Sequence, residues 1–457
     1  MQNQVSLFKN CYTLENCGKG KFSKTEKKML IPRQHYVEQL ASRLDNGMVK
    51  VITGIRRCGK SVLLFELFAN YLVESGIPEQ NIVKIPLDED DYAALRDPGK
   101  LNAYIKDKTS NSKSKYYIFI DEAQFAISKE EVKKRDAPIR LYGVLNGLLR
   151  KHNLDVYITG SNSKFLSTDV LTEFRGRGDE IRIAPLSFSE FYSADTKDKY
   201  EALSEYSLYG GLPHIVAERT AEGKAKYLDH LLKEIYLKDI CERYNLKDGS
   251  GMQELMQVIA SAIGSLTNPQ KISSTFASSG YKGISAPTIS SYLSILQECF
   301  MTKKAQRYNV KGRKYISTPS KYYYTDLGIR NAVLGFRQYE ETHIMENIIF
   351  NELLHRGYLV DVGVVEINIS ENSKHLKKQL EVDFVANKGN KRYYVQSAFA
   401  LPDNQKIEQE QASLVNIPDS FKKIIVVGTP SPLWRNEQGI TIMSIYDFLL
   451  NPNSLDL

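Results

Sequence analysis

Apolar and polar positions in the first 195 residues alternate in blocks of strand length and helix length. A stretch with helical spacing comes first, at residues 34–44. Apolar runs follow at 51–53, 81–92, 116–121, 155–160 and 180–192. Short apolar runs separated by amphipathic stretches are typical of strands that alternate with helices. This part of the chain therefore predicts an α/β unit built on a parallel sheet.

The pattern changes after this unit. Residues 196–250 have helical spacing, which the sequence YGGLP (209–213) interrupts with glycine and proline, both of which break helices. Between 251 and 335, three helical stretches precede a basic segment that predicts a hairpin with Gly312 at its tip. From 336 to 457 the pattern predicts a helix and several strands.

The composition is that of an ordinary soluble globular protein, because 42% of the 457 residues are hydrophobic and 25% are charged. This length predicts about three domains. No apolar stretch approaches the roughly 20 residues that cross a bilayer, and the N-terminus lacks an apolar signal segment. Five scattered cysteines argue against a disulfide framework. We therefore expect a cytoplasmic protein without a membrane segment.

Positive charge is concentrated at the N-terminus. Residues 1–28 carry six lysines and two glutamates, which account for four of the seven net positive charges. This segment is polar and shows no clear periodicity, so we predict a disordered extension. The alternative is an artefact of start-codon choice, because Met29 opens the first folded pattern. The small charge of the remainder is weak evidence for nucleic-acid binding.

A phosphate-binding loop follows the first apolar run. Residues 54–61, GIRRCGKS, fit the pattern G-x-x-x-x-G-K-[ST], with a strand pattern before and a helix pattern after. The glycines let the backbone approach a polyphosphate, Lys60 would reach the β- and γ-phosphates, and Ser61 would ligate Mg²⁺. The predicted nucleotide contacts are Gly54, Ile55, Arg56, Arg57, Cys58, Gly59, Lys60, Ser61 and Val62.

An acidic pair ends a later apolar run. Residues 116–121, YYIFID, lead directly into Glu122. Together with a phosphate loop, such a run forms a Walker B pattern. Asp121 would hold Mg²⁺ through water, and Glu122 would polarise the attacking water. A solvated turn is the alternative for an isolated Asp-Glu pair.

Two further segments place polar or basic side chains near the expected γ-phosphate. The run 155–160 ends in Ser161 and Asn162, and ligands of parallel α/β sheets lie at the carboxyl ends of strands. Either side chain would hydrogen-bond the γ-phosphate or the water, while a turn with a helix N-cap is a compatible alternative. Arg175 and Arg177 would stabilise transition-state charge, in the same subunit or in a neighbour's site, unless they are solvated surface arginines.

The order of these parts resembles AAA-type ATPases. More narrowly, the motifs GIRRCGKS, IDEAQ, TGSNSK, FRGRGDEIRIAPLSFSEF and YGGLPHIV resemble one prokaryotic family whose members join an AAA domain to a C-terminal domain of unknown function. The resemblance extends from about Met29 to Val427. It implies ATP and Mg²⁺ as ligands, ATP hydrolysis as the activity, and a helical lid that includes residues 209–213.

Three helices followed by a basic hairpin predict a winged helix in residues 251–335. The third helix (285–300) would enter a DNA major groove, and the wing would contact the backbone. The wing residues predicted to bind DNA are Lys303, Lys304, Arg307, Lys311, Arg313 and Lys314. The alternative is a winged helix that docks a protein, because the third helix itself carries almost no positive charge.

The last part of the chain resembles the restriction-endonuclease-like fold in the placement of three residues. Glu346 lies on a predicted helix, Asp383 on a strand and Gln396 on the next strand. Nucleases of that fold need Glu-x-Lys at the third position, where the carboxylate holds Mg²⁺ and the lysine stabilises charge at the attacked phosphate. Ala398 stands where the lysine is expected, so we predict a degenerate domain used for binding or assembly.

The sequence as a whole predicts an α/β protein of five segments. They are a basic extension (1–28), an AAA-type P-loop ATPase domain (29–195), a helical lid (196–250), a winged helix (251–335) and a degenerate nuclease-like domain (336–457). We predict that Mg-ATP turnover moves the attached domains on double-stranded DNA or a DNA-bound partner. The alternatives are a slow nucleotide-dependent switch that acts through protein partners, and an ATP-gated nuclease. A homo-oligomer is a further alternative to a monomer. Only in a homo-oligomer would Arg175 or Arg177 act in the active site of a neighbouring subunit.

Overall fold

The computed structural model describes residues 30–111, 113–128, 130–131, 139–160, 178–195, 197–244, 246, 249–278, 284–371 and 374–457. Residues 31–457 form one of two separate units, the other being residues 1–30. The predicted N-terminal extension, residues 1–28, lies outside the described residues.

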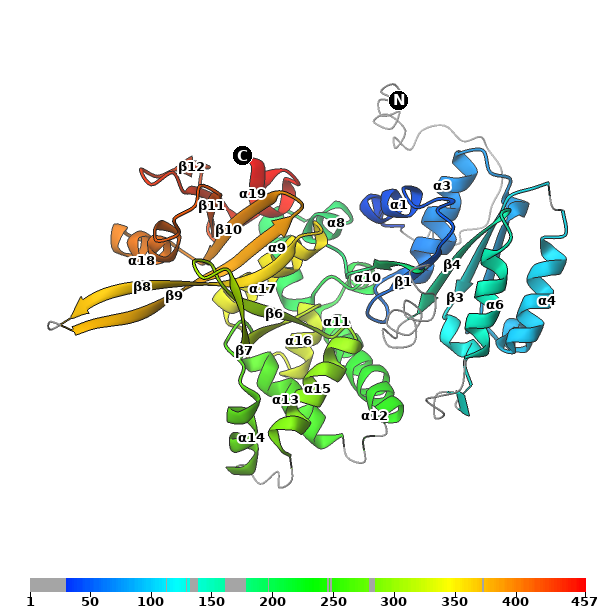
Figure 1. The fold of residues 1–457 in the computed structure, drawn as a ribbon, viewed down its shortest axis with the longest axis horizontal. Coiled ribbons are helices and arrows are strands. Elements are labelled where there is room, and N and C mark those ends of the chain that lie inside the picture. Colours follow the sequence, from blue (N-terminus) through cyan, green and yellow to red (C-terminus); the bar gives the residue numbers. More distant parts are fainter. Residues whose placement is uncertain are drawn as a thin grey trace. The chain divides into compact units, whose positions relative to one another are not determined.

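A five-stranded sheet carries the first part of the described chain (Figure 1). Its strands are β1 (Val49–Thr53), β2 (Ile82–Pro86), β3 (Tyr116–Asp121), β4 (Leu154–Gly160) and β5 (Gly178–Arg182). All neighbouring strands are parallel, as expected for apolar runs that alternate with helices. Their spatial order is β2–β3–β4–β1–β5, so β4 lies between β1 and β3. The predicted α/β unit on a parallel sheet is thereby confirmed.

Helices cover both faces of this sheet, because side chains alternate between the faces along each strand. Ile52 of β1 packs in a cluster that includes Phe68, and Val51 packs in a second cluster that includes Leu145. The first face carries α1 (Gln34–Ala41), α2 (Lys60–Val62), η2 (Leu63–Phe68) and α3 (Ala69–Glu74). The second face carries α4 (Pro98–Lys108) and α6 (Arg140–Leu149). Short helical turns are η3 (Glu79–Asn81), η4 (Asp90–Arg96) and η5 (Ala123–Ala126).

A helical region follows the first sheet. Its helices are α8 (Phe188–Ser193), α9 (Lys199–Tyr209), α10 (Pro213–Ala217), α11 (Ala221–His230), η7 (Leu231–Leu237), α12 (Lys238–Tyr244), α13 (Ser250–Ser261), α14 (Pro269–Ser278) and α15 (Ala286–Glu298). The interruption expected at 209–213 is present, since Tyr209 ends α9 and Pro213 occupies the first turn of α10. Within the described part of the chain, no helix is both long and apolar enough to span a bilayer.

A mixed eight-stranded sheet occupies the second half of the chain, in the order β12–β13–β11–β10–β9–β8–β6–β7. Its strands are β6 (Thr302–Asn309), β7 (Lys314–Tyr324), β8 (Leu359–Glu371), β9 (Lys374–Lys388), β10 (Lys391–Ala398), β11 (Lys422–Val427), β12 (Trp434–Arg435) and β13 (Thr441–Ser444). The accompanying helices are α16 (Leu327–Val333), α17 (Glu341–His355), α18 (Asn404–Val415), α19 (Ile445–Leu450) and η8 (Ser454–Asp456). The hairpin predicted as a wing is β6–β7, and β6 pairs with β8. One sheet therefore extends across residue 335, where the sequence suggested a domain boundary.

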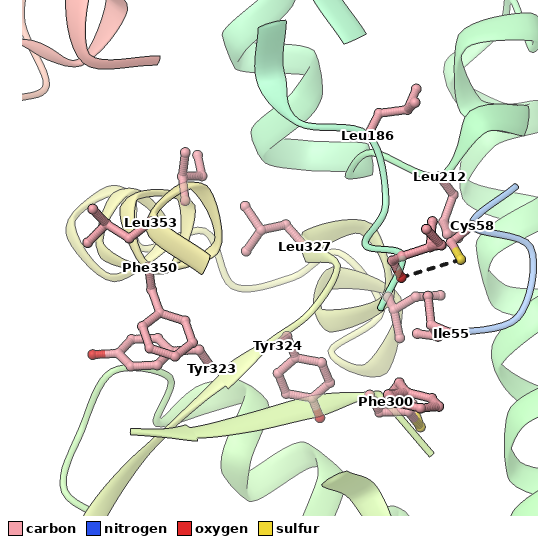
Figure 2. Packing of buried hydrophobic residues seen from close by; sticks show 14 of the residues in the cluster. Ile55, Cys58, Leu186, Leu212, Phe300, Tyr323, Tyr324, Leu327, Phe350 and Leu353 are labelled. Carbon is pink, nitrogen blue, oxygen red and sulfur yellow. Dashed lines mark hydrogen bonds between the residues drawn. The ribbon is translucent and has the colours of Figure 1, made fainter. Parts of the chain in front are cut away.

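One hydrophobic core joins the first sheet to the second half of the chain. Ile55 and Cys58 of the phosphate loop belong to the same cluster of buried side chains as Leu212, Phe300 and Phe350. Figure 2 shows these residues together with others of this cluster. Because close-packed side chains transmit displacement, the phosphate loop is connected by packing to the segment before β6 and to α17.

Candidate active site

The phosphate loop connects β1 to α2 and depends on two glycines. Gly54 has a φ of +149° and Gly59 a φ of +98°, both in a region that favours glycine. A Cβ on Gly54 would also overlap the backbone oxygen of Ile183, which follows β5. Larger residues at these two positions would therefore force the loop into another shape.

Lys60 begins the helix after the loop and is only 4% exposed. Its Nζ atom donates hydrogen bonds to the backbone oxygens of Gly54 and Ile55, each at 3.1 Å. These bonds hold the ammonium group against the loop. An anion bound by the loop amides would therefore meet a fixed positive charge, which is the arrangement that a phosphate needs.

Asp121 ends β3 beside the carboxyl end of β4, because these two strands are neighbours. It is 3% exposed and forms hydrogen bonds with the hydroxyl groups of Thr159 and Ser61. Burial raises the pKa of this carboxyl group, and the two hydrogen bonds act in the opposite direction. A carboxylate and a hydroxyl side by side supply oxygen ligands of the kind that Mg²⁺ prefers. Asp121 and Ser61 therefore fit the metal position expected of them.

Glu122 has a left-handed backbone conformation, with a φ of +48°. Its N–H donates to Thr159 Oγ1 at 3.0 Å, and its carboxylate accepts a hydrogen bond from the side chain of Gln124. The Gln124 Oε1 atom is buried and has no hydrogen-bond partner among the residues that the structure describes. A buried acceptor of this kind points to a donor from a ligand or a bound water.

Two residues outside the predicted set hold the loop from other elements. Arg33, before α1, donates to Cys58 O at 3.1 Å and to Ala184 O at 3.0 Å. Tyr236, in η7, donates its hydroxyl to Arg56 O at 2.9 Å. The loop is thus tied both to the sheet and to the helical region. Neither residue belongs to a sequence motif, so only the tertiary structure reveals them.

Pro213 and Thr159 were also absent from the prediction, although the sequence contained a signal for each. The Cγ atom of Pro213 would lie 3.6 Å from a Cβ on Gly59, so the YGGLP segment packs directly on the phosphate loop. The sequence indicated that segment as a helix break within a lid. Thr159 lies at the carboxyl end of a strand, where ligands of parallel sheets bind.

Among the other predicted residues of this site, two have side chains in the core and four lie outside the described residues. Ile55 and Cys58 turn their side chains into the core, where Cys58 Sγ lies 3.7 Å from Ile183 O (Figure 2). Their backbone amides, rather than their side chains, are therefore available to a ligand. The residues predicted to contact the γ-phosphate or the attacking water, Ser161 and Asn162, lie outside the described residues. The predicted arginines, Arg175 and Arg177, lie outside them as well.

The six basic residues predicted to bind DNA occupy two environments. Near the hairpin tip, the exposed residues are Lys311, Arg313 and Lys314. Along the strands, the half-buried residues are Lys303, Lys304 and Arg307. Lys303 lines a cavity that also contains residues of α1 and α17. The tip residues therefore supply the open basic surface of this hairpin.

The predicted nuclease-like residues come together around a lysine from another strand. Lys321 Nζ on β7 lies 2.8 Å from Glu346 Oε1, 2.7 Å from Glu381 Oε1 and 4.0 Å from Asp383 Oδ1. Asp383 donates its N–H to Gln396 Oε1 at 3.4 Å. Burial, followed by the charge of Glu346, raises the pKa of Asp383 well above its usual range. The sequence motif contained neither Lys321 nor Glu381.

Lys321 forms ion pairs with two carboxylates of this acidic cluster, Glu346 and Glu381. Across the described residues, no group of three or more histidine, cysteine or acidic side chains is arranged to hold a metal ion. The cluster is therefore an internal ion-pair network, with the lysine supplied by β7 instead of β10.

Comparison with known proteins identifies similar sequences over most of the chain. Residues 46–192 match a family model described as an AAA domain, and residues 200–340 match a domain of unknown function (DUF8612). An uncharacterized protein of Haemophilus influenzae is 35% identical over 428 residues, which cover 93% of this chain and 99% of that protein. An uncharacterized protein of Methanocaldococcus jannaschii is 27% identical, covering 81% of this chain and 79% of that protein.

Similarity to solved structures is more distant. The Aeropyrum pernix ORC1 protein in complex with DNA is 12% identical with a TM-score of 0.28, covering 67% of this chain and 92% of that chain. The Aeropyrum pernix ORC2 protein in its ADP form is also 12% identical, with a TM-score of 0.32 and coverage of 69% and 93%.

Proposed function

This chain belongs to the family of the uncharacterized Haemophilus influenzae protein and contains an AAA domain, and on this premise we propose that it binds ATP with Mg²⁺ and hydrolyses it. The observation that carries the proposal is the convergence of Lys60, Ser61, Asp121 and Thr159 where β1, β3 and β4 end. Phosphate binding requires a fixed positive charge, which Lys60 would supply. Hydrolysis requires a positioned water molecule, which Glu122 would hold.

Each group has a proposed role. Lys60 and the loop amides would bind the phosphates, while Ser61 and Asp121 would hold Mg²⁺. The metal ion, when bound, neutralises charge on the phosphate oxygens. Glu122 would orient the attacking water and accept its proton, and the hydrogen bond from Gln124 would fix its carboxylate. The roles assigned to Ser161, Asn162, Arg175 and Arg177 remain part of this proposal.

Two variants test the proposal, each with a matched control. Lys60→Ala should lose ATP binding, and Glu122→Gln should bind ATP but release little phosphate. Lys106→Ala and Glu74→Gln change exposed residues of the same types and should behave as wild type. ATP affinity would be measured with a fluorescent analogue and turnover by phosphate release. Retained affinity in Lys60→Ala would overturn the binding site, and retained turnover in Glu122→Gln would overturn the role of that carboxylate.

We further propose that turnover moves the helical region against the phosphate loop. The contacts of Tyr236 with Arg56 and of Pro213 with Gly59 support this coupling, because both join the loop to helices beyond the sheet. A change in loop shape would therefore reach the helical region directly.

The proposed target of this movement is double-stranded DNA or a DNA-bound partner, and the exposed Arg313 and Lys314 support it. The test compares ATP turnover with and without DNA, in wild type and in Arg313→Glu/Lys314→Glu. Stimulation that disappears in the variant supports DNA coupling. Turnover indifferent to DNA favours the alternative, a switch that acts through a protein partner.

For the C-terminal part we propose binding or assembly instead of nucleic-acid cleavage. The supporting observation is the ion pairing of Lys321 with Glu346 and Glu381, which occupies the carboxylates that would otherwise take a metal. Incubation of the full-length protein with plasmid DNA, Mg²⁺ or Mn²⁺ and ATP tests this proposal. Cleavage that disappears in Asp383→Asn would establish the ATP-gated nuclease in its place.

A further inference from the structure

A cavity of about 300 Å³ lies where α1, the segment after β5, the start of β6 and α17 meet. His35, Arg182, Lys303 and His355 line it, and they come from four separate parts of the chain. Ile55 of the phosphate loop forms part of the wall, whereas Lys60 and Asp121 do not line it. The cavity is therefore adjacent to the candidate active site but distinct from it.

Two cations give the cavity its charge. Within the described part of the chain, neither the exposed side chain of Arg182 nor the half-buried side chain of Lys303 has an ion-pair or hydrogen-bond partner. Burial, together with the neighbouring Arg182, lowers the pKa of Lys303 to about 8. Two carboxylates lie nearby. Glu180 accepts a hydrogen bond from Thr53 at 2.6 Å, and Glu352, which lines the cavity, pairs with Arg356 at 2.6 Å. Two close cations without a dedicated counter-ion favour an anionic ligand.

The histidines of the cavity add no competing charge. Burial lowers the pKa of His35 below its usual value and that of His355 to about 4, so both rings are neutral at pH 7. The ring of His355 lies 5.2 Å from that of His35, and its Nδ1 atom lies 3.4 Å from the hydroxyl of Tyr36. The positive charge is thus concentrated on Arg182 and Lys303.

The remaining wall is largely aromatic and aliphatic. The guanidinium of Arg182 lies over the ring of Phe300, 4.5 Å from its centroid, and Tyr36, Phe188 and Ile348 line other parts of the wall. Ligand sites typically combine an apolar wall with a few convergent polar groups. A wall of this kind would bind the apolar body of a ligand, while the two cations would bind a charged end.

We propose that this cavity binds a small organic anion, with a phosphate or carboxylate group between Arg182 and Lys303 and an aromatic or aliphatic body against Phe300. The ligand would also act on the phosphate loop, because Ile55 contributes to the wall and Ile183, another lining residue, contacts Gly54. Occupation of the cavity would therefore alter the affinity of the loop for its own ligand.

Isothermal titration of the full-length protein with phenyl phosphate, benzoate and inorganic phosphate tests the proposal. We expect saturable binding of phenyl phosphate or benzoate with one site per chain, and the stronger of the two identifies the charged group. Arg182→Gln and Lys303→Gln should each weaken binding at least about tenfold, because each removes a charge-assisted contact. Lys304→Gln, the neighbouring residue on the opposite face of β6, is the matched control and should bind as wild type. Thermal melts establish that each variant is folded.

Three results would overturn the proposal. They are no saturable binding of any probe, binding that both glutamine variants retain, and inorganic phosphate binding as tightly as phenyl phosphate. The Lys60→Ala variant separates this cavity from the candidate active site. Undiminished phenyl phosphate binding by that variant supports the cavity, and binding lost with Lys60 assigns the probe to the phosphate loop and overturns the proposal.

Discussion

The carboxylate of Asp326 accepts a hydrogen bond from the backbone N–H of Gly211 at 2.8 Å, and so fixes the loop between α9 and α10 to the start of α16. Asp326 is 2% exposed and also accepts from Ile329 N at 3.0 Å. A side chain on Gly210 would overlap its carboxylate. The same loop places Pro213 against Gly59. Through the loop between α9 and α10, these two contacts connect the phosphate loop to the start of α16.

The first prediction concerns the pH dependence of this connection. Burial raises the pKa of Asp326 from 3.8 to about 6, so the folded protein keeps a proton that the unfolded chain releases between pH 4 and 6. The resulting stabilisation is present below pH 4 and is lost as pH rises through 6. Between pH 4.5 and 7, the free energy of unfolding of wild type relative to Asp326→Asn should fall by about 2 kcal/mol.

Urea unfolding of both proteins at several pH values measures this difference. The subtraction removes the contribution of His355, whose lowered pKa of about 4 acts in the opposite direction in both proteins. A difference that stays constant across this pH range would show that Asp326 is already ionised in the folded protein at pH 4.5.

The second prediction concerns the packing of α16 on α9. A Cβ on Gly328 would overlap the backbone oxygen of Tyr209, so Gly328→Ala should destabilise the protein by about 2 kcal/mol or more. Gly143, within α6, has no atom within 4 Å of its Cβ position, and Gly143→Ala should be neutral or stabilising by up to about 1 kcal/mol. Because Tyr209 begins the YGGLP loop, Gly328→Ala should also raise KM for ATP. Equal stability of Gly328→Ala and Gly143→Ala would contradict the contact.

The parallel sheet was predictable from the sequence because its signals are local. The phosphate-loop pattern and the apolar run that ends in Asp121 each specify their element within a few residues. No single segment of the sequence specifies that β4 lies between β1 and β3. The carboxyl end of β4 predicted Ser161 and Asn162, whereas the hydrogen bond of Thr159 with Asp121 depends on β3 and β4 being neighbours.

The second sheet shows the limit of local patterns. Three helices and a hairpin predicted a separate winged helix, but the pairing of β6 with β8 depends on residues far apart in the chain. The same pairing brings Lys321 to Glu346 and Asp383, whereas the sequence motif required a lysine at position 398. Tertiary placement thus supplied a charge that spacing along one strand could not reveal.

The third prediction tests Thr159 as a positioning residue. Its hydroxyl donates to Asp121 and accepts from the N–H of Glu122, so Thr159→Val removes both bonds at nearly constant shape. We expect kcat for ATP hydrolysis to fall about tenfold to a hundredfold, since both carboxylates lose their orientation. ATP affinity should change little, because Lys60 and the loop amides are untouched. Thr159→Ser restores the hydroxyl and should recover most of the activity; a valine variant with wild-type kcat would assign Thr159 to packing alone.

The fourth prediction concerns Lys321, whose side chain is only 5% exposed between Glu346 and Glu381. The surrounding carboxylates raise its pKa, although burial acts against them. Lys321→Met leaves buried acidic groups without a cation and should cost about 3–5 kcal/mol of unfolding free energy.

Adding Glu346→Gln to that variant removes one uncompensated charge and should recover part of the loss. Lys391→Met is the matched control, because Lys391 pairs with Asp456 at 3.0 Å on the surface and exposed pairs contribute about 1 kcal/mol or less. Urea unfolding of the four proteins at pH 7 measures these differences. If Lys321→Met were no less stable than Lys391→Met, the carboxylates around it would have to be protonated, and the cluster would be held by hydrogen bonds instead of charge.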